Sequence, residues 1–385
     1  MRVLLAPDKF KGSLSAAEVA DHLAAGLGAS APGVEVDRLP VADGGDGTVD
    51  AAVATGYHRV PVQALGPTGE TVETAFAERD GVAVVELADV SGLRRLPEGK
   101  LAPLVASSYG TGQVIRAALD AGCRKVVLGV GGSASTDGGA GLFEALGARL
   151  LDTAGEPVPR GGAGLGRLDR LDLSELHPAL RTAEIVVACD VDNPLTGPTG
   201  AAAVYGPQKG ASASDVVILD AALRHWARVV AETTGQDRSS VPGAGAAGGV
   251  AFGALAVLGA TLRPGIELVL ELIGFADRLP GADLVVTGEG SLDEQTLRGK
   301  APAGVAAAAN ASGIPVVAVA GRCLLTPAKL RAAGIRRAYA LTALQPDPAR
   351  SMAEAGPLLE RVAGRIVKDW LLRPIAPSSS TEEKT

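Results

Sequence analysis

The sequence predicts an α/β fold, in which a doubly wound parallel sheet domain is interrupted by a second, inserted α/β domain of mixed sheet. Three observations predict it. Short apolar strands alternate with helical patterns near both ends of the chain, which is typical of a parallel sheet with helices on both faces. The middle of the chain carries closely spaced apolar segments separated by turn residues, which is typical of antiparallel strands. The length, 385 residues, suits two or three domains.

The elements near the N-terminus are predicted from strand and cap signals. Ser13 or Ser15 starts a helix, because Glu18 lies three positions after Ser15 and completes a capping box. The other expected elements here are strands over 3–6 and 34–41 and a helix over 47–55.

The C-terminal third repeats the strand and helix alternation. Strands are expected over 284–287, 316–320 and 338–341, and helices over 300–312, 326–334 and 352–372. With the two N-terminal strands these make five, so residues 1–58 and 282–372 should form one domain and residues 59–281 the insertion. The polar residues 373–385 are expected to be a disordered tail.

The middle of the chain is expected to form the mixed sheet. Antiparallel strands are predicted over 60–63, 72–77 and 82–87, further strands over 125–130 and 184–189, a helix over 140–148 and a glycine-rich loop over 157–166. The apolar stretch 243–262 contains six glycines, so we interpret it as a buried helix and not as a membrane span.

Composition excludes several classes of function. The net charge is −7 and there is no long basic run, which argues against binding to nucleic acid. Cys123, Cys189 and Cys323 are few and far apart, as expected in a reducing compartment. The apolar run at the N-terminus is too short for a signal peptide. We therefore expect a cytoplasmic protein without nucleic-acid or membrane partners.

The segment KVVLGVGGSASTDGGAG, residues 125–141, combines a strand with a glycine turn. Gly129, Gly131 and Ala134 match the fingerprint G-x-G-x-x-G/A of dinucleotide-binding folds, and a tight turn is the purely structural alternative. Asp137 argues against a dinucleotide, because its carboxylate would repel a pyrophosphate unless a metal ion lay between them. A carboxylate among glycines suits a magnesium nucleotide better.

Four other loops combine acidic residues with glycine or proline after a predicted strand: PDKFKGS, ADGGDGT, CDVDNPLTGP and GEGSLDEQTLRGK. The carboxyl ends of parallel strands are where such sheets place ligands. Asp190, Asp192 and Asn193 are the most crowded group, and packed carboxylates repel unless they share a proton or a cation. Oxygen ligands of this kind suit magnesium bound to substrate phosphates.

Cations accompany these loops: Lys9, Lys11, Lys209, Lys300 and Arg322. Phosphoryl transfer needs positive groups where phosphoryl oxygens gather charge. The Walker A motif and the G-x-S-x-G elbow are both absent, and the four histidines lie outside the glycine loops.

The loops as a set resemble the bacterial glycerate kinase family, in the class that includes glycerate 2-kinases. The matching blocks are APDKFKGSLSA, VADGGDGT, GVGGSASTDGGAG, ACDVDNPLTGPTGAA, YGPQKGA, GAAGG and GEGSLDEQTLRGKAP, which occur in family order from residue 3 to about residue 367. The resemblance implies phosphorylation of D-glycerate with ATP and Mg2+ as cofactors. It also implies that the domain built from both chain ends is flavodoxin-like.

On these blocks we assign roles by chemistry. Asp190, and after it Asp192, is expected to orient or deprotonate the attacking hydroxyl, and Lys209 or Lys300 to neutralise the phosphoryl group. Substrate contacts are expected from Asp8, Lys9, Lys11, Ser13, Asp43, Asn193, Glu289, Asp293 and Arg322. Nucleotide contacts are expected from Gly131, Gly132, Ser133, Asp137, Gly138 and Lys300, and metal contacts from Asp137 and Asp293.

The expected product is phosphoglycerate, with 2-phosphoglycerate favoured over 3-phosphoglycerate. Two alternatives stay open at this point. One is an NAD(P)-dependent oxidoreductase that uses the 129–134 glycine loop, and the other is a non-catalytic glycerate-binding protein. The partners expected are D-glycerate and ATP, and a homodimer is the assembly considered.

Overall fold

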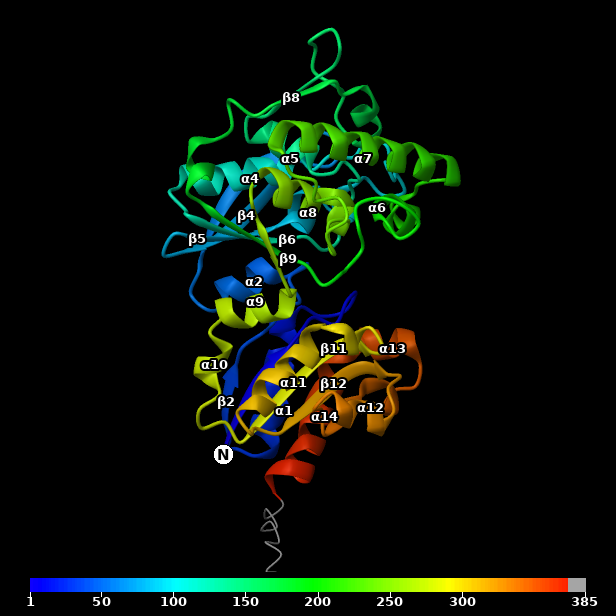
Figure 1. The fold of residues 1–385 in the computed structure, drawn as a ribbon. Coiled ribbons are helices and arrows are strands. Elements are labelled where there is room, and N and C mark those ends of the chain that lie inside the picture. The colour runs from blue at the N-terminus through cyan, green and yellow to red at the C-terminus, as the bar shows by residue number, and fades with distance from the viewer. Residues whose placement is uncertain (373–385) are drawn as a thin grey trace, which may run out of the picture. The chain divides into compact units, whose positions relative to one another are not determined.

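The computed structural model describes residues 1–372, except for the side chain of Arg298, and the predicted tail lies outside these residues. The chain divides into two compact units (Figure 1). The first unit contains residues 1–40, 276–294 and the described residues from Val305 on, and the second contains residues 41–275 and 295–304. The predicted limits at residues 58 and 282, as limits of separately folding domains, stay a prediction.

The first unit is built on a five-stranded sheet in the order β13-β12-β11-β1-β2, and every neighbouring pair is parallel. The order changes direction at β1. Right-handed crossovers therefore place α1 on one face of the sheet and the helices that follow β11 and β12 on the other. This is the flavodoxin-like arrangement, and the predicted α/β fold class is confirmed. The strands are β1 (Arg2–Pro7), β2 (Glu35–Arg38), β11 (Leu284–Leu292), β12 (Val316–Cys323) and β13 (Arg337–Ala340).

The helices of this part of the chain are α1 (Ala16–Ser30), α10 (Phe275–Arg278), α11 (Ala301–Ala311), α12 (Pro327–Ala332), α13 (Pro348–Ala353) and α14 (Ala355–Ile366). The capping box at the start of α1 is confirmed, since Ser15 N–H donates to Glu18 Oε2 at 2.8 Å and Glu18 N–H donates to Ser15 Oγ at 3.3 Å. The predicted helix over 352–372 is divided, because the chain turns at Glu354 between α13 and α14, and a π-helix, Val367–Leu371, continues α14.

The second unit is built on a six-stranded mixed sheet in the order β10-β9-β6-β5-β4-β3. β4 pairs antiparallel with β3 and β5, as predicted, whereas β5, β6, β9 and β10 run parallel. The strands are β3 (His58–Leu65), β4 (Thr71–Arg79), β5 (Val82–Glu86), β6 (Lys125–Gly129), β9 (Glu184–Ala188) and β10 (Thr261–Arg263). A separate antiparallel pair consists of β7 (Arg149–Leu151) and β8 (Arg170–Asp172).

The helices of the second unit are α2 (Thr48–Val53), α3 (Leu87–Ser91), α4 (Tyr109–Asp120), α5 (Ala140–Ala145), α6 (Ala201–Tyr205), α7 (Ala213–Thr234), α8 (Ala246–Val257) and α9 (Gly265–Leu272). The expected helix over 140–148 ends early because Gly147 has φ +108°, where the chain turns towards β7. The glycine-rich segment 157–166 was expected to be a loop, and a 3₁₀ helix covers Gly162–Arg167.

Among the helices of the second unit, α8 was misjudged in part, and α3, α4, α6, α7 and α9 were given no bounds from the sequence. α8 occupies part of the apolar stretch 243–262 and is buried as predicted, but it contains a non-helical kink at residues 247–249. For α7, the sequence around His225 indicates a helical pattern but was given no bounds, although Ser212 and Asp215 form a capping box at its start and Gly235 ends it with φ +72°. Among residues 1–372, no helix is both long and apolar enough to cross a bilayer.

Candidate functional site

Three strands of the second unit end at the same level of the sheet. Glu86 at the end of β5 is in register with Gly129 at the end of β6, and Gly129 is in register with Ala188 at the end of β9. The loops that follow these strands therefore leave the same edge of the sheet. Two of them are the predicted loops that contain Gly131 and Asp190.

The loop of residues 42–47 packs directly against the loop after β6. A side chain at Gly129 would place its Cβ 2.4 Å from the carbonyl oxygen of Gly44, and one at Gly131 would place its Cβ 3.0 Å from Gly45 Cα. The distance at Gly129 is compatible only with glycine and the distance at Gly131 is tighter than an ordinary contact, so the two backbones touch. The sequence therefore uses glycine at 129 and 131 for close approach and not only for turning.

Asp190 lies beside the start of α9. The N–H of Gly265 donates to Asp190 Oδ1 at 2.7 Å, and a Cβ on Gly265 would lie 2.1 Å from the carbonyl oxygen of Asp43. Asp43, Asp190 and the first residue of α9 thus form one cluster, which we call the Asp190 cluster. Both carboxylates were predicted site residues.

The surroundings of Asp190 oppose its ionisation. Burial of the carboxylate among protein atoms raises its pKa to about 6, the Gly265 hydrogen bond lowers it, and the charges of Asp43 and Glu267 raise it further. Although the carboxylate packs among protein atoms, the residue as a whole is exposed to solvent. Solvent screening therefore limits how far the pKa of Asp190 rises. An exposed carboxylate with an elevated pKa is suited to accept a proton from a ligand.

The other members of the 189–198 loop have different surroundings. Asp192 is exposed. Asn193 uses both ends of its amide, because its Nδ2 donates to the carbonyl of Thr199 at 2.8 Å and its Oδ1 accepts from the hydroxyl of Tyr205 at 2.5 Å. These bonds fix the shape of the loop.

Asp137 is fully buried. Its carboxylate accepts hydrogen bonds from Ser108 N–H and Ser108 Oγ, both at 2.8 Å, and longer ones from Ser107 Oγ and the amides of Gly139 and Gly141. The carboxylate therefore ties the loop after β6 to the start of α4. Its predicted contacts with nucleotide and metal stay predictions, and the hydrogen bonds give it a structural role.

Lys209 is also buried, at 2% exposure. Its Nζ donates to Ser133 Oγ at 2.8 Å and to the carbonyl of Ser135 at 2.5 Å. Burial lowers the pKa of this amine to about 7, and the charge of Asp137 partly opposes that effect. The ammonium group thus supports the glycine loop from inside the protein.

Within the loop after β6, only the tip faces solvent. Gly131 and Gly132 are exposed, while Ser133 and Gly138 are buried. The helix α5 begins only at Ala140, so the glycines do not open a helix as the dinucleotide fingerprint requires. The side-chain oxygens of Ser135 and Thr136 are buried and have no hydrogen-bond partner among the described residues.

Lys300 lies in the short segment 295–304, which belongs to the second unit. Its carbonyl accepts from the amides of Ala303 and Gly304 in the first turn of α11. A Cβ on Gly304 would lie 2.3 Å from Cγ1 of Ile266. The segment therefore packs on α9, whose first amide holds Asp190.

In the first unit, predicted site residues gather at the carboxyl ends of β1, β11 and β12. Asp8 N–H donates to the carbonyl of Gly288 at 2.8 Å, and Glu289 pairs in register with Ala320. Ser291 Oγ donates to Asp293 Oδ2 at 3.3 Å and accepts from Arg322 Nε at 3.0 Å.

The remaining predicted residues of the first unit lie in the 7–13 loop. Lys9 is partly buried and Lys11 is exposed. Lys9 N–H donates to Asp8 Oδ1 at 2.7 Å, and Ser13 Oγ donates to the carbonyl of Met352 at 2.7 Å. The predicted substrate contacts of the first unit stay predictions.

Sequence reasoning missed Glu86. It is 4% exposed and lies at the end of β5 beside a polar cavity of about 390 Å³. Burial and the charge of Asp46 raise its pKa to about 7, against the effect of Arg94. The signal in the sequence was a glutamate that directly follows the apolar run Val82–Val85.

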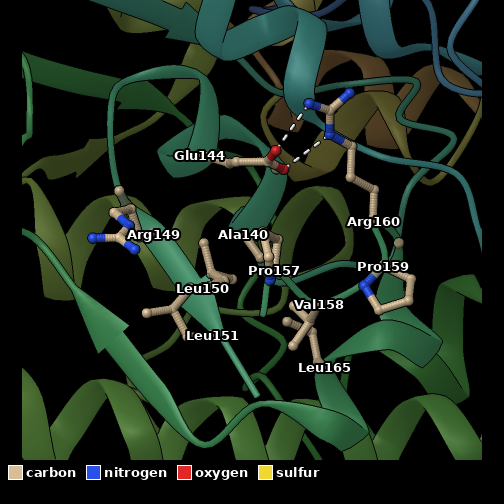
Figure 2. Close-up of a pocket in the computed structure, with 13 residues that line it drawn as sticks. Ala140, Glu144, Arg149, Leu150, Leu151, Pro157, Val158, Pro159, Arg160 and Leu165 are labelled. Carbon is tan, nitrogen blue, oxygen red and sulfur yellow. Dashed lines mark hydrogen bonds and ion pairs between the residues drawn. The ribbon is translucent and has the colours of Figure 1, made fainter. Parts of the chain in front are cut away.

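A second cavity, of about 160 Å³, lies between α5 and the segment 157–161 (Figure 2). Apolar side chains such as Leu150, Val158 and Leu165 line it. Arg160 and Glu144 form a bidentate ion pair, in which both hydrogen bonds are 2.9 Å long. None of the predicted site residues lines this cavity. No group of three or more histidine, cysteine, aspartate or glutamate side chains suited to a metal ion occurs in the described part of the chain.

Comparison with known proteins agrees with the motifs. The sequence profile described as the glycerate kinase family matches residues 3–371. The chain is 43% identical to a glycerate kinase of Halalkalibacterium halodurans, over 96% of this chain and 98% of the relative. It is 44% identical to a glycerate 2-kinase of Escherichia coli, over 83% of this chain and 85% of the relative.

A solved crystal structure from Salmonella typhimurium LT2, provisionally described as glycerate kinase 2, has the same fold. It superposes with a TM-score of 0.83 at 41% identity, and the match covers 97% of this chain and 100% of the other. The resemblance that the loop motifs indicated is therefore confirmed, and the dinucleotide alternative lacks both the family and the helix that it needs. The chain belongs to the glycerate kinase family.

Proposed function

We propose that this chain transfers the γ-phosphoryl group of ATP to a hydroxyl group of D-glycerate, and that 2-phosphoglycerate is the product. The observation that carries the proposal is the Asp190 cluster. An exposed carboxylate with an elevated pKa lies at the carboxyl end of β9, held by the first amide of α9. The name of the Escherichia coli relative, glycerate 2-kinase, supports the 2-position.

The proposed reaction uses Asp190 as the proton acceptor. The hydroxyl oxygen of glycerate attacks the γ-phosphorus of ATP, and the bond from that phosphorus to the β,γ-bridging oxygen breaks. Asp190 orients the hydroxyl and takes its proton as the new P–O bond forms, and ADP leaves. The Gly265 N–H fixes the carboxylate during this step, which is how positioned groups contribute to phosphoryl transfer.

The exposed glycine tip fits the phosphates of ATP. Backbone at Gly131 and Gly132 has no side chains to obstruct a bound anion, and glycine loops after a parallel strand are common phosphate sites. Lys209 reaches this loop from within, through Ser133 and the Ser135 carbonyl. We assign it the task of holding the loop in shape, with its charge acting on the phosphates only through the loop.

Magnesium fits one part of the donor set and not another. Asp43 is near enough to Asp190 that its charge raises the pKa of Asp190, and Mg2+ is commonly held by one or two carboxylates together with phosphate oxygens and water. Asp43 is therefore the carboxylate that fits the ion, and Asp190 stays available to take the proton. Asp137 does not fit, because five hydrogen bonds surround its buried carboxylate. When bound, the ion would offset the charge of the transferred phosphoryl group.

The test supplies the purified chain with D-glycerate and either ATP or NAD+. Formation of ADP only with ATP is expected, and formation of NADH would support the oxidoreductase instead. Binding of glycerate without either product would support the binding protein. The position of the phosphoryl group is read by proton NMR of the product, and by whether enolase alone converts it further, since enolase acts on the 2-isomer directly. A product that first needs a mutase would contradict the 2-position.

A further inference from the structure

The loop that carries Asp43 is anchored by a buried glutamate outside the predicted site. Glu86 Oε2 accepts from Gly47 N–H at 3.0 Å and from Val49 N–H at 3.5 Å. These amides lie where the loop of residues 43–47 enters α2. The carboxylate therefore binds the end of the loop that leads into α2.

Arg94 also binds this loop, and it lies after α3 in the connection between β5 and β6. Its guanidinium makes ion pairs with Asp46 of the loop, with Glu86 at 3.3 Å and with Asp89 of α3 at 2.9 Å. Arg95 donates to Asp89 as well, at 2.7 Å. Glu86 and Arg94 thus connect the loop to β5 and α3, both of which are packed into the core.

The other end of the loop lies in the Asp190 cluster. Gly44 packs against Gly129 and against Gly265, and the Asp43 carbonyl lies against Gly265. Asp43 also influences Asp190 electrostatically. A displacement at Gly47 would therefore move Asp43, at the other end of the same loop, and so disturb Asp190, the proposed proton acceptor.

We propose that Glu86 is a positioning residue for the reaction, which holds the loop of residues 43–47 so that Asp43 keeps its place beside Asp190, and that Arg94 ties the same loop to α3. This inference rests on the proposed function for its effect on turnover. The contacts that define it lie within the second unit and do not involve a ligand. Glu86 itself does not reach the reacting atoms in this assignment.

The experiment compares Glu86→Ala with Glu86→Gln. Alanine removes both acceptor contacts, so kcat should fall by 10-fold to 100-fold, roughly the effect of a small misplacement in an active site. Glutamine keeps an acceptor oxygen for Gly47, so kcat of Glu86→Gln should stay within about threefold of the wild-type value. Glu78→Ala is the matched control, because Glu78 also accepts from a glycine amide, Gly81 at 3.0 Å, at the opposite end of the sheet.

A second readout reports on the loop without turnover. Hydrogen exchange in a peptide covering residues 41–53 should accelerate in Glu86→Ala, remain near normal in Glu86→Gln, and be unchanged in Glu78→Ala. Peptides from β1 and β12 should exchange at the same rate in all variants, which separates a local effect from loss of folding. Should alanine prevent folding, Glu86→Asp provides the test, since it keeps the charge but shortens the reach, and the same loop-specific acceleration is expected.

The pH profile adds a readout that a structural role alone would not move. The charged groups that face Glu86 or line its cavity are Asp46, Asp50, Arg59, Asp89, Arg94 and Arg95. Protonation of Glu86 weakens its pairing with Arg94 and leaves an acceptor for Gly47, as glutamine does. KM for glycerate in the wild-type enzyme should therefore approach the value of Glu86→Gln as pH falls through about 7, whereas KM of Glu86→Gln should not change over that range.

The outcomes distinguish two failures. A folded Glu86→Ala variant with unchanged kcat, KM and loop exchange would overturn the positioning role. An unchanged enzyme that forms no ADP with glycerate would instead refute the proposed function, and the exchange measurement would still decide whether Glu86 anchors the loop.

Discussion

At the scale of single residues, Asp190 decides whether the proposed chemistry is correct. Asp190→Asn keeps the size of the side chain and the acceptor for Gly265 N–H, but it removes the charge that accepts a proton. We expect kcat to fall by roughly 10²–10⁴, the usual effect of losing a general base. KM for glycerate should change little, because the interaction is made mainly in the transition state. Steady-state kinetics of both enzymes measure this.

The control for Asp190 is Asp172→Asn, since Asp172 accepts from a backbone amide, Ser174 at 3.0 Å, in a turn away from these loops. It should leave kcat unchanged. The pH profile gives a further check. Because the ionised carboxylate is the active form, kcat of the unchanged enzyme should decline as pH falls through about 6, the pKa of Asp190, and Asp190→Asn should lack this decline. A variant that keeps kcat within a few-fold would pass the role to Asp192.

Lys209 gives a residue-scale prediction about stability. Its folded pKa, about 7, is lower than the ordinary value of 10.5 because the amine is buried. Between these two values the unfolded chain binds a proton that the folded chain does not, so this lysine makes stability rise with pH from about 7 towards 10, by up to about 1.4 kcal/mol per pH unit. Below pH 7 both forms are protonated and the slope vanishes.

Denaturant unfolding of the wild-type protein and of Lys209→Met gives the free energy of unfolding at each pH from 7 to 10. The difference between the two proteins measures the slope that Lys209 contributes, and Lys209→Met should lack that contribution. Lys125→Met is the matched control, because this lysine of β6 is accessible and pairs with Glu184 at 3.2 Å, and the slope should remain. Equal slopes in the Lys209 and Lys125 variants would show that Lys209 is not the source.

At the scale of elements, the close contact between the 42–47 loop and the loop after β6 is the feature to test. Gly129→Ala adds one methyl group 2.4 Å from the Gly44 carbonyl, and Gly129 has no positive φ that alanine would disfavour. The loops must therefore separate. We expect a destabilisation of about 1–3 kcal/mol, as for overpacked sites, and a fall in kcat/KM of at least tenfold.

Gly166→Ala is the control for this substitution, since a Cβ at Gly166 meets no atom within 4 Å. Its Tm and kcat/KM should match those of the unchanged protein. If Gly129→Ala also left both quantities unchanged, the contact between the two loops would have no functional importance.

At the scale of the whole molecule, the first sheet is assembled from distant parts of the sequence. β1 lies between β2 and β11, and its residues Val3, Leu4 and Leu5 are 0% exposed. A fragment of residues 1–58 supplies only two of the five strands and should be unfolded. Circular dichroism of that fragment tests this, and a cooperative thermal transition would contradict it.

Metal dependence is also a property of the whole enzyme. If Mg2+ acts with ATP, excess EDTA should abolish ADP formation and added Mg2+ should restore it. Full turnover in excess chelator would remove the role of the ion.

The sequence by itself determined the fold class, the family and the identity of the loops. Strand and helix alternation is a local pattern, and the loop motifs are runs of neighbouring residues. Both can therefore be identified from the sequence alone. Asp190 was singled out for the same reason, as a carboxylate directly after an apolar run. Its helix partner Gly265, 75 residues away, could not be inferred from spacing.

Only the tertiary structure decided what surrounds each side chain. Asp137 and Lys209 looked like ligands for phosphate or metal because they stand in or beside glycine loops, yet both are buried and bonded to the loop after β6. Glu86 lay unremarked inside the predicted strand over 82–87, and only the tertiary structure placed it beside the loop of residues 43–47. The physical reason is that burial and hydrogen bonding depend on segments that are far apart in the chain, whereas motifs depend only on neighbours.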